Sequence, residues 1–195
     1  MSQVKIQGNA SGTGIFTIAA PNSNTDRTLT LPDSTGTVLT NATQSIPQSA
    51  LPTGSVLQVV QTASSTQVSF TTQDVETYIF QGSITPLSST SKILAIATIS
   101  GISNGGAGRM AGRLRWNTTS GNTSGTQIAG LTQVALAGAG TSYLAAAAMT
   151  GLTTAVGSTS TQYIKVTFTH FDTSGTCYVC QYGSESQLTL MEIAA

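Results

Sequence analysis

Charged residues are scarce in this chain of 195 residues, and their scarcity excludes several classes of protein. Asp, Glu, Lys and Arg make up 7% of the sequence and the net charge is +0, whereas about 25% of an average soluble domain is charged. No strong field of either sign is therefore available to attract nucleic acid or an anionic membrane. Solubility normally depends on charge, so a free monomer with such a surface would tend to associate. We expect an oligomer or a component of a larger assembly.

Long apolar runs are also missing. No window approaches the roughly 18 consecutive apolar residues of a membrane helix, and the nearest candidate, residues 141–152, is interrupted by Thr and Gly. The opening residues, MSQVK, lack the apolar region of a secretory signal peptide. The sequence therefore predicts synthesis in a cytoplasm, without membrane insertion.

Residue types that carry catalysis or bind metals are few. Cys177 and Cys180 form a CxxC pattern. In an extended strand, however, their side chains would point to opposite faces with Cα atoms about 10 Å apart, too far for a disulfide. No second pair of Cys or His completes a zinc site. The sequence contains no GxSxG motif with a serine nucleophile that His170, the sole histidine, could activate. We expect structural roles for all three residues, and no metal or cofactor.

One pair of carboxylates leaves an enzymatic alternative. Asp74 and Glu76 would share a strand face with Cα atoms about 7 Å apart, and a glycosidase needs two carboxylates at a comparable separation across a cleft. Spacing alone is common in solvated pairs. We therefore predict that the protein is not an enzyme, with a polysaccharide depolymerase as the alternative.

Short alternating runs dominate what is present. Ser and Thr supply roughly 30% of the chain, far above average usage, while 39% hydrophobic residues argue against disorder. Alternation of apolar and polar residues predicts strands, at residues 55–61, 66–72, 76–84, 92–100, 109–116, 141–149, 162–170, 176–182 and 187–193. The alanine run 145–148 leaves a short helix as a local alternative. Many short strands with turn signals predict an all-β sandwich or barrel.

The first quarter of the chain differs from the rest. Residues 1–54 hold four of the five prolines and, apart from Phe16, no aromatic residue. We predict a β-rich attachment and trimerisation arm at 1–40, a Pro/Ser-rich linker at 41–54 and a β-sandwich head at 55–195. Within the arm, IFTIA and RTLTL read as strands of a small meander that one chain cannot bury alone. Three copies around a threefold axis would bury its apolar side chains, Phe16, Ile18, Leu29, Leu31 and Leu39.

Basic residues gather on one predicted strand. Arg109, Arg113 and Arg115 share one face of the strand at 109–116, and Trp116 lies on the other face. The simplest interpretation is a polar sheet face. The alternative is a contact face, formed by these arginines and Trp116, for a neighbouring subunit, a capsid partner or an anionic sugar.

Between Arg115 and Lys165 the chain carries no charge at all. Such a span is difficult to place on a free surface. It is typical of a buried subunit interface, where charged residues are depleted.

The opening stretch carries a resemblance to a known family. Residues 12–43, GTGIFTIAAPNSNTDRTLTLPDSTGTVLTNAT, resemble a short β-rich segment of tailed-bacteriophage virion proteins, with its "TLTLP…GTVL" core. This segment is found in tail fibres and head-decoration proteins of marine and cyanobacterial phages. Residues from SKILAIATISG through YIKVTFTH to SQLTLMEI are similar to the β-sandwich heads of such fibres. The resemblance implies a homotrimer with a jelly-roll head, an N-terminal stem and no catalytic motif.

Two functions follow as hypotheses from this resemblance. The first is a trimeric capsid decoration (cement) protein of the virion, which binds and stabilises the assembled head. The second is a receptor-binding tail fibre or spike that recognises a host surface glycan through exposed aromatic residues such as Trp116, Tyr143 and Tyr182. A cellular C1q-like binding module shares only the β pattern. The expected partners are other copies of the chain and a capsid or tail protein, with no nucleic acid and no membrane.

Overall fold

The structure is a computed structural model with two compact units, Met1–Thr40 and Asn41–Ala195. It describes residues 10–15, 17, 19, 22–26, 28, 51–104, 108–130, 134–136, 144–171 and 175–195. Among them, no helix is long or apolar enough to pass through a membrane.

The described residues of the first unit lie in turns, bends and segments without regular secondary structure. The side chain of Ile15 is 94% exposed, and the amide of Thr25 donates to Ser23 Oγ at 3.1 Å in a short turn. The five apolar side chains on which the predicted meander depends, Phe16, Ile18, Leu29, Leu31 and Leu39, lie outside the described residues. The meander and its trimerisation role therefore stay predictions.

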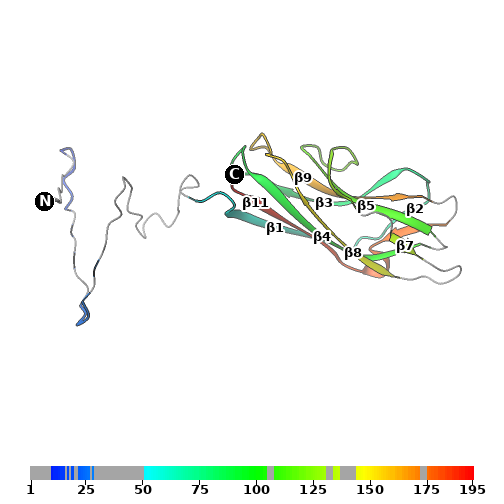
Figure 1. Ribbon diagram of the computed structural model, residues 1–195, viewed down its shortest axis with the longest axis horizontal. Coiled ribbons are helices and arrows are strands. Elements are labelled where there is room, and N and C mark those ends of the chain that lie inside the picture. Colours follow the sequence, from blue (N-terminus) through cyan, green and yellow to red (C-terminus); the bar gives the residue numbers. More distant parts are fainter. Residues whose placement is uncertain are drawn as a thin grey trace. The chain divides into compact units, whose positions relative to one another are not determined.

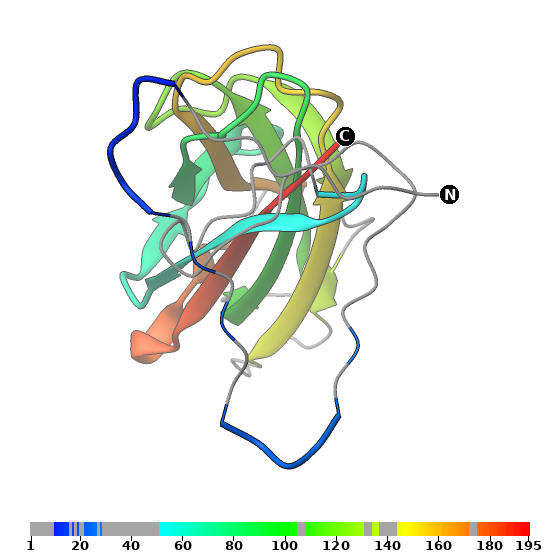
Figure 2. The same cartoon turned by 90° about the vertical axis from the view of Figure 1, so that its left-hand side faces the viewer.

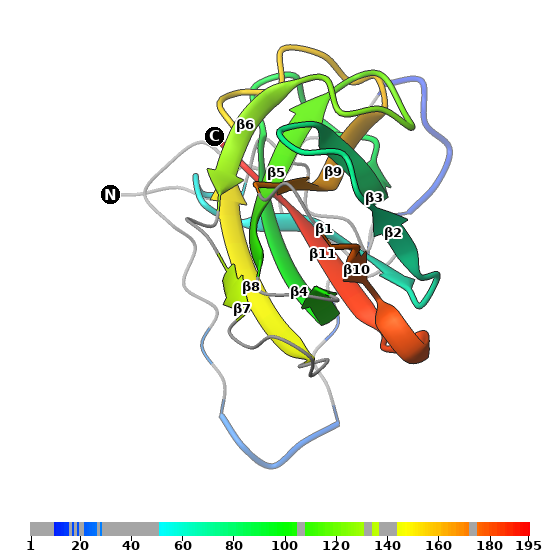
Figure 3. The same cartoon turned by 90° about the vertical axis from the view of Figure 1, so that its right-hand side faces the viewer.

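The second unit consists of two antiparallel sheets (Figure 1). The six-stranded sheet runs in the order β1 (Val56–Ser64), β11 (Ser186–Ile193), β4 (Lys92–Asn104), β10 (Cys177–Val179) and β2 (Val68–Phe70), with β8 (Ala145–Leu152) also paired to β4. The five-stranded sheet runs in the order β3 (Glu76–Ile84), β9 (Gln162–His170), β5 (Gly108–Asn117) and β6 (Thr126–Gly130), with β7 (Val134–Leu136) also paired to β5. Figure 3 shows the two layers facing each other.

The strand order is that of a jelly roll. When the three-residue strands β2, β7 and β10 are set aside, the first sheet reads β1-β11-β4-β8 and the second reads β3-β9-β5-β6. Except for the β5–β6 pair, which are neighbours in the second sheet, successive strands thus cross between the sheets, and the first strand of the sandwich lies beside the last. This order confirms the predicted all-β, jelly-roll-like sandwich.

Most predicted strands are present. The bounds of β3 and β9 agree with the prediction, and the alanine run 145–148 is a strand, within β8. The strand predicted at 176–182 ends at Val179, because Cys180 and Tyr182 have positive φ angles of 56° and 57° that extended backbone excludes.

The strands β6 and β7 were not predicted from the sequence. No strand was predicted between residues 116 and 141, whereas Thr126 begins β6 and Val134 begins β7. The TQIAG sequence of β6 shows no clear alternation of apolar and polar residues, because four of its five residues are small or polar. The strand is also short and pairs with only part of β5. Pairing with β5, and not local propensity, makes it a strand.

The core lies between the sheets and is built by matching large side chains with small ones. On β11, Leu188 and Leu190 stand opposite Ala97 and Ala95 of β4, and all four are fully buried. The inner face of β9 contributes Ile164, Val166 and Phe168, also fully buried. Alternation of this kind lets the two layers interdigitate at high density.

Gly112 of β5 makes room for the largest of these side chains. A Cβ atom built at Gly112 would lie 2.9 Å from Cζ of Phe168 and 3.3 Å from the sulfur of Met149. Any larger residue there would have to displace the phenyl ring, so the packing of Phe168 depends on a bare backbone at this point.

Glu192 places a carboxylate at the end of the core face of β11. The side chain is fully buried. It accepts hydrogen bonds from Gln58 Nε2 at 2.6 Å and from the backbone amides of Leu87 at 2.8 Å and Ser88 at 3.2 Å. Burial acts to raise the pKa of Glu192, but these hydrogen bonds outweigh it and hold the pKa below its ordinary value of 4.5. The carboxylate thus fastens the connection between β3 and β4 to the end of the sheet.

We predict that Glu192→Gln destabilises the head by about 1–3 kcal/mol at neutral pH, because three donors lose a charged acceptor. A carboxylate with a lowered pKa stabilises the fold above its ordinary pKa, and that contribution is lost as pH falls through the folded-state value. The difference in unfolding free energy between wild type and variant should therefore shrink below about pH 4.5. Urea denaturation across this range measures it.

Glu185→Gln is the matched control, since Glu185 is exposed. It should change the stability by less than about 0.5 kcal/mol. A Glu192→Gln protein with wild-type stability at neutral pH would show that the carboxylate does not hold this loop.

Candidate functional site

The three arginines of the predicted face lie on the outer side of β5, where Arg113 contacts β9 and Arg115 contacts β3. Arg115 makes a two-point salt bridge through Nε and Nη2 to the carboxylate of Glu76 on β3, and its Nη1 donates to Gly125 O at 3.1 Å. Arg113 Nη1 donates to Thr169 Oγ1 at 2.6 Å. Arg109 is exposed at the other end of the strand. These side chains link β3, β9 and β5 on the outer face of the sheet.

Glu76 is the acidic centre of this network. Thr167 Oγ1 also donates to its Oε1. Partial burial acts to raise the pKa of Glu76, but the hydrogen bonds from Arg115 and Thr167 hold it below its ordinary value. Asp74, its proposed partner in a glycosidase pair, precedes the strand with a φ of 57°. The two carboxylates therefore do not share a strand face, and Glu76 is already neutralised by Arg115.

Lys165 of β9 lies at the centre of the same outer face and is fully buried. Its ammonium donates to Asn117 Oδ1 at 2.7 Å, to Asn122 Oδ1 at 2.6 Å and to Ser124 O at 3.1 Å. We call these three acceptors the oxygen cage. Burial lowers the pKa of Lys165 below its ordinary value. All three acceptors are neutral, so the loop between β5 and β6 is organised around a cation without a carboxylate.

The loop of the oxygen cage is tied at further points. Gly121 N donates to Gln81 Oε1 on β3 at 2.9 Å. The side-chain oxygens of Asn117 and Asn122 also accept from the amides of Thr119 and Ser124, each two residues on. The role of these two asparagines was not predicted from the sequence. The available signal was that Lys165 stands alone on a strand after a long charge-free span, and a lone buried ammonium needs oxygen acceptors.

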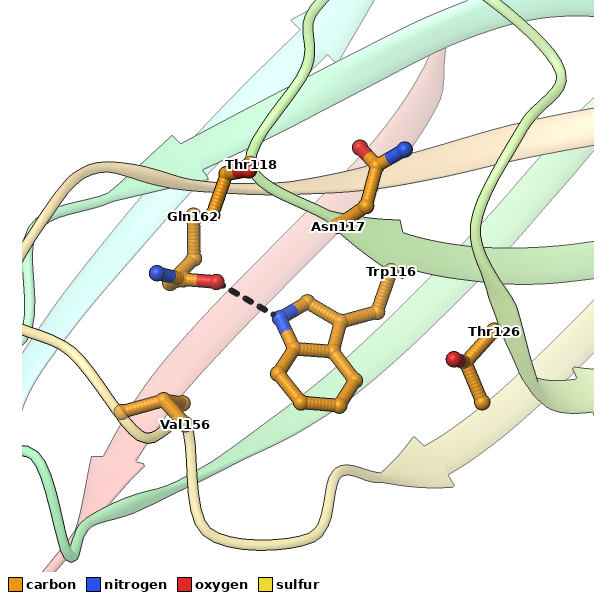
Figure 4. A pocket seen from close by; sticks show the side chains of 6 residues that line it. All are labelled: Trp116, Asn117, Thr118, Thr126, Val156 and Gln162. Carbon is orange, nitrogen blue, oxygen red and sulfur yellow. Dashed lines mark hydrogen bonds between the residues drawn. The ribbon is translucent and has the colours of Figure 1, made fainter.

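Trp116 lies on the opposite face of β5 from the three arginines and lines a hollow at the rim of the sandwich (Figure 4). The hollow has a volume of about 240 Å³, and its lining residues are Trp116, Asn117, Thr118, Thr126, Val156 and Gln162. The indole N–H donates to Gln162 Oε1 at 2.9 Å. None of these lining residues is charged.

The outer face of the six-stranded sheet is apolar, unlike the polar outer face of the five-stranded sheet. Val59, Met191, Leu94 and Leu152 stand opposite one another on β1, β11, β4 and β8, the four strands that Figure 2 shows side by side in cyan, red, green and yellow. Their chain neighbours Val60, Leu190 and Ala95 belong to the core or pack against it, so strand alternation directs this row outward. Val59 is 56% exposed and Leu152 is 51% exposed.

Further apolar residues flank this row. Val56 pairs with Ile193 on one side, and Ile96 lies on the other side between Thr189 and Thr150. We define the apolar outer face as Val56, Val59, Leu94, Ile96, Leu152, Met191 and Ile193. Among the described residues of these four strands that point the same way, Lys92 is the only charged one. A contiguous apolar surface across four strands usually marks a contact with another molecule.

The remaining candidates occupy structural positions. Cys177 and Cys180 are buried thiols. His170 is fully buried on the core face of β9, and within the described part of the chain no group hydrogen-bonds either ring nitrogen. Tyr182 is 74% exposed, whereas Tyr143 lies outside the described residues. The described residues contain no group of three or more His, Cys, Asp or Glu side chains placed to hold a metal ion.

Comparison with known proteins gives little more. No protein-family model matches the chain, and no curated protein matches it. Among solved structures, the chain is similar to a chain in "Structure of infectious bursal disease virus Gx strain", with a TM-score of 0.32 and 11% sequence identity. The similarity covers 72% of this chain and 37% of that chain. A similarity at this level does not bear on function.

We predict that Lys165→Met destabilises the head by about 1–3 kcal/mol, because the oxygen cage loses its only cationic donor and its oxygens must find water. The amides of residues 117–125 should exchange with solvent faster, since the loop loses its central anchor. Urea denaturation and hydrogen exchange measure the two effects.

Lys92→Met on exposed Lys92 is the matched control and should leave the stability within about 0.5 kcal/mol of wild type. If Lys165→Met matches wild type in both stability and loop exchange, the ammonium is not what organises this loop.

Proposed function

We propose that the chain is a bacteriophage virion structural protein: a homotrimeric capsid decoration (cement) protein that binds and stabilises the assembled head. The observation that carries this proposal is the apolar outer face, which the described part of the chain leaves uncovered. The jelly-roll head, the scarcity of charge and the resemblance of residues 12–43 to phage virion proteins support it further.

The apolar outer face is the surface that we assign to contacts between subunits. Burial of a few hundred Å² of apolar area at about 25 cal/mol per Å² contributes several kcal/mol before ordering costs. Lys92 lies at the margin of this face, opposite Ile193, so no cluster of like charges opposes the approach of a second subunit. The charge-free span of the sequence contributes β8, with Leu152, to the same face.

The proposed role requires binding and not catalysis. A protein that binds the assembled capsid lattice, and not the free capsid subunits, stabilises the lattice by mass action. In the proposed arrangement, residues 1–40 attach the trimer to the capsid protein and the jelly-roll head projects from it. The internal engagement of Glu76 and Arg115 supports a non-enzymatic role, because it leaves this pair unavailable for acid–base chemistry.

A receptor-binding tail fibre or spike is the second candidate. The Trp116 hollow favours it, since an aromatic ring beside neutral polar side chains suits a surface glycan. Both candidates are virion proteins that carry the same trimeric head, and they differ in where the protein is attached.

We predict that the wild-type protein has the mass of a trimer at micromolar concentration and that Leu152→Asp shifts it to monomer. A carboxylate at the β8 end of the apolar outer face would have to be buried against the neighbouring subunit without a partner. Light scattering coupled to size-exclusion chromatography measures the mass, and circular dichroism confirms the fold.

Ser83→Asp is the control, because Ser83 is an exposed residue on a strand of the other sheet. It should remain trimeric. A monomeric wild type, or a trimer that tolerates Leu152→Asp, would contradict the assignment of this face.

Immunogold electron microscopy of intact virions tests the location. The decoration role predicts gold distributed over the capsid, and stripping the protein should lower the temperature at which capsids release DNA. Gold confined to the tail would replace the decoration role with the fibre role, and unlabelled particles would overturn both.

A further inference from the structure

We propose that the Trp116 hollow binds a single ring of a neutral saccharide. The inference goes beyond the decoration role and deepens the second candidate, the glycan-binding fibre, by naming the class of ligand at this site. Its test measures sugar binding directly and does not depend on where the protein is attached to the virion. The inference rests on the chemistry of the lining, on the way the indole ring is held and on the rigidity of the surrounding loop.

The polar edge of the indole ring is already satisfied. Its N–H donates to Gln162 Oε1 at 2.9 Å, and Gln162 Nε2 donates to Ser160 O at 2.8 Å. The ring is therefore fixed in orientation, and what it offers a ligand is carbon surface. The C–H face of a pyranose is the complement of such a surface, because it is flat and apolar while the sugar's edges remain polar.

The remaining polar groups of the lining suit hydroxyl ligands. Thr118 and Thr126 are exposed, and each carries a hydroxyl that can both donate and accept. Asn117 is committed to Lys165 and Ser124. With no charged residue in the lining, a phosphate or a carboxylate would lose hydration without gaining an ion pair. The lining thus selects neutral polyhydroxylated ligands.

The size of the hollow limits the ligand to about one ring. Its volume of about 240 Å³ lies below the roughly 300–1,000 Å³ of pockets for drug-sized molecules. A single ring on an open hollow binds weakly. Repetition of the site around a trimer, and over many trimers on one particle, would multiply such weak contacts.

The loop that walls the hollow is held in place before any ligand arrives. The oxygen cage of Lys165 fixes Asn117 and Ser124 on either side of the loop. Trp116 pairs directly with Thr126 across the β5–β6 ladder. Between Ser124 and Thr126, Gly125 adopts a φ of +123°, and a Cβ there would lie 2.6 Å from Trp116 O. A wall built in this way costs little ordering entropy on binding.

The test uses the full chain and exploits the fact that Trp116 is its only tryptophan. Methyl glycosides of glucose, galactose, mannose and N-acetylglucosamine are titrated to high millimolar concentration while tryptophan emission is recorded. We expect a saturable change with at least one glycoside. The same glycoside should show saturation-transfer NMR contacts to aromatic protons.

Variants of the lining localise the signal. The double variant Thr118→Val with Thr126→Val should raise the dissociation constant about threefold to tenfold, through lost hydrogen bonds. Trp116→Phe should weaken the saturation-transfer signal while the fold is retained. Thr150→Val, on exposed Thr150 of β8, should bind as wild type does.

Three outcomes would overturn the proposal. The first is no response to any of the four glycosides. The second is an unchanged dissociation constant in the double threonine variant. The third is a fluorescence response to a proline-rich peptide and to none of the sugars, which would assign the hollow to a peptide ligand instead.

Discussion

The ammonium of Lys165, held by three neutral oxygens, is the interaction on which the outer side of the β3-β9-β5-β6 sheet depends. It fixes the loop that receives one arm of Arg115 at Gly125, and that loop also forms a wall of the Trp116 hollow. Glu192 uses the same chemistry with the opposite sign, because the side-chain amide of Gln58 and the backbone amides of Leu87 and Ser88 donate to its buried carboxylate. With few charges available, the chain neutralises these two with dipoles supplied by its abundant polar uncharged residues.

The two outer faces of the sandwich are chemically different, and the difference supports an orientation. On the Lys165 side, the β5–β6 loop covers the ammonium of Lys165, and Arg115 is paired with Glu76 within the chain. The opposite side exposes Val59 and Leu152 in a continuous apolar row. A subunit in the proposed trimer would therefore turn the β1-β11-β4-β8 sheet toward its neighbours and leave the rim with Trp116 accessible.

Local patterns in the sequence were sufficient to predict the architecture, because the alternation that marks a strand involves residues that are close together in the chain. The bounds of β9 follow from Ile164, Val166 and Phe168 alternating with polar residues. Alternation cannot predict which outward-pointing side chains other parts of the chain will cover. Lys165 points away from the core, yet the β5–β6 loop, which contributes Asn122 from 43 residues earlier in the chain, buries it. The apolar outer face could not be predicted from the sequence for a related reason. Its members are separated along the chain, and only the register of four strands brings them into one row.

The pairing of β1 with β11 has a consequence for the order in which the molecule is made. Val56 and Ile193 are partners, although nearly the whole head separates them along the chain. A ribosome delivers β1 early, but the strand that belongs beside it, and the Glu192 that secures the β3–β4 connection, emerge only at the end of the head. Long-range pairing of this kind folds slowly. Until translation passes β11, both edges of the gap between β1 and β4 are unpaired, and the nascent chain is exposed to aggregation at those edges.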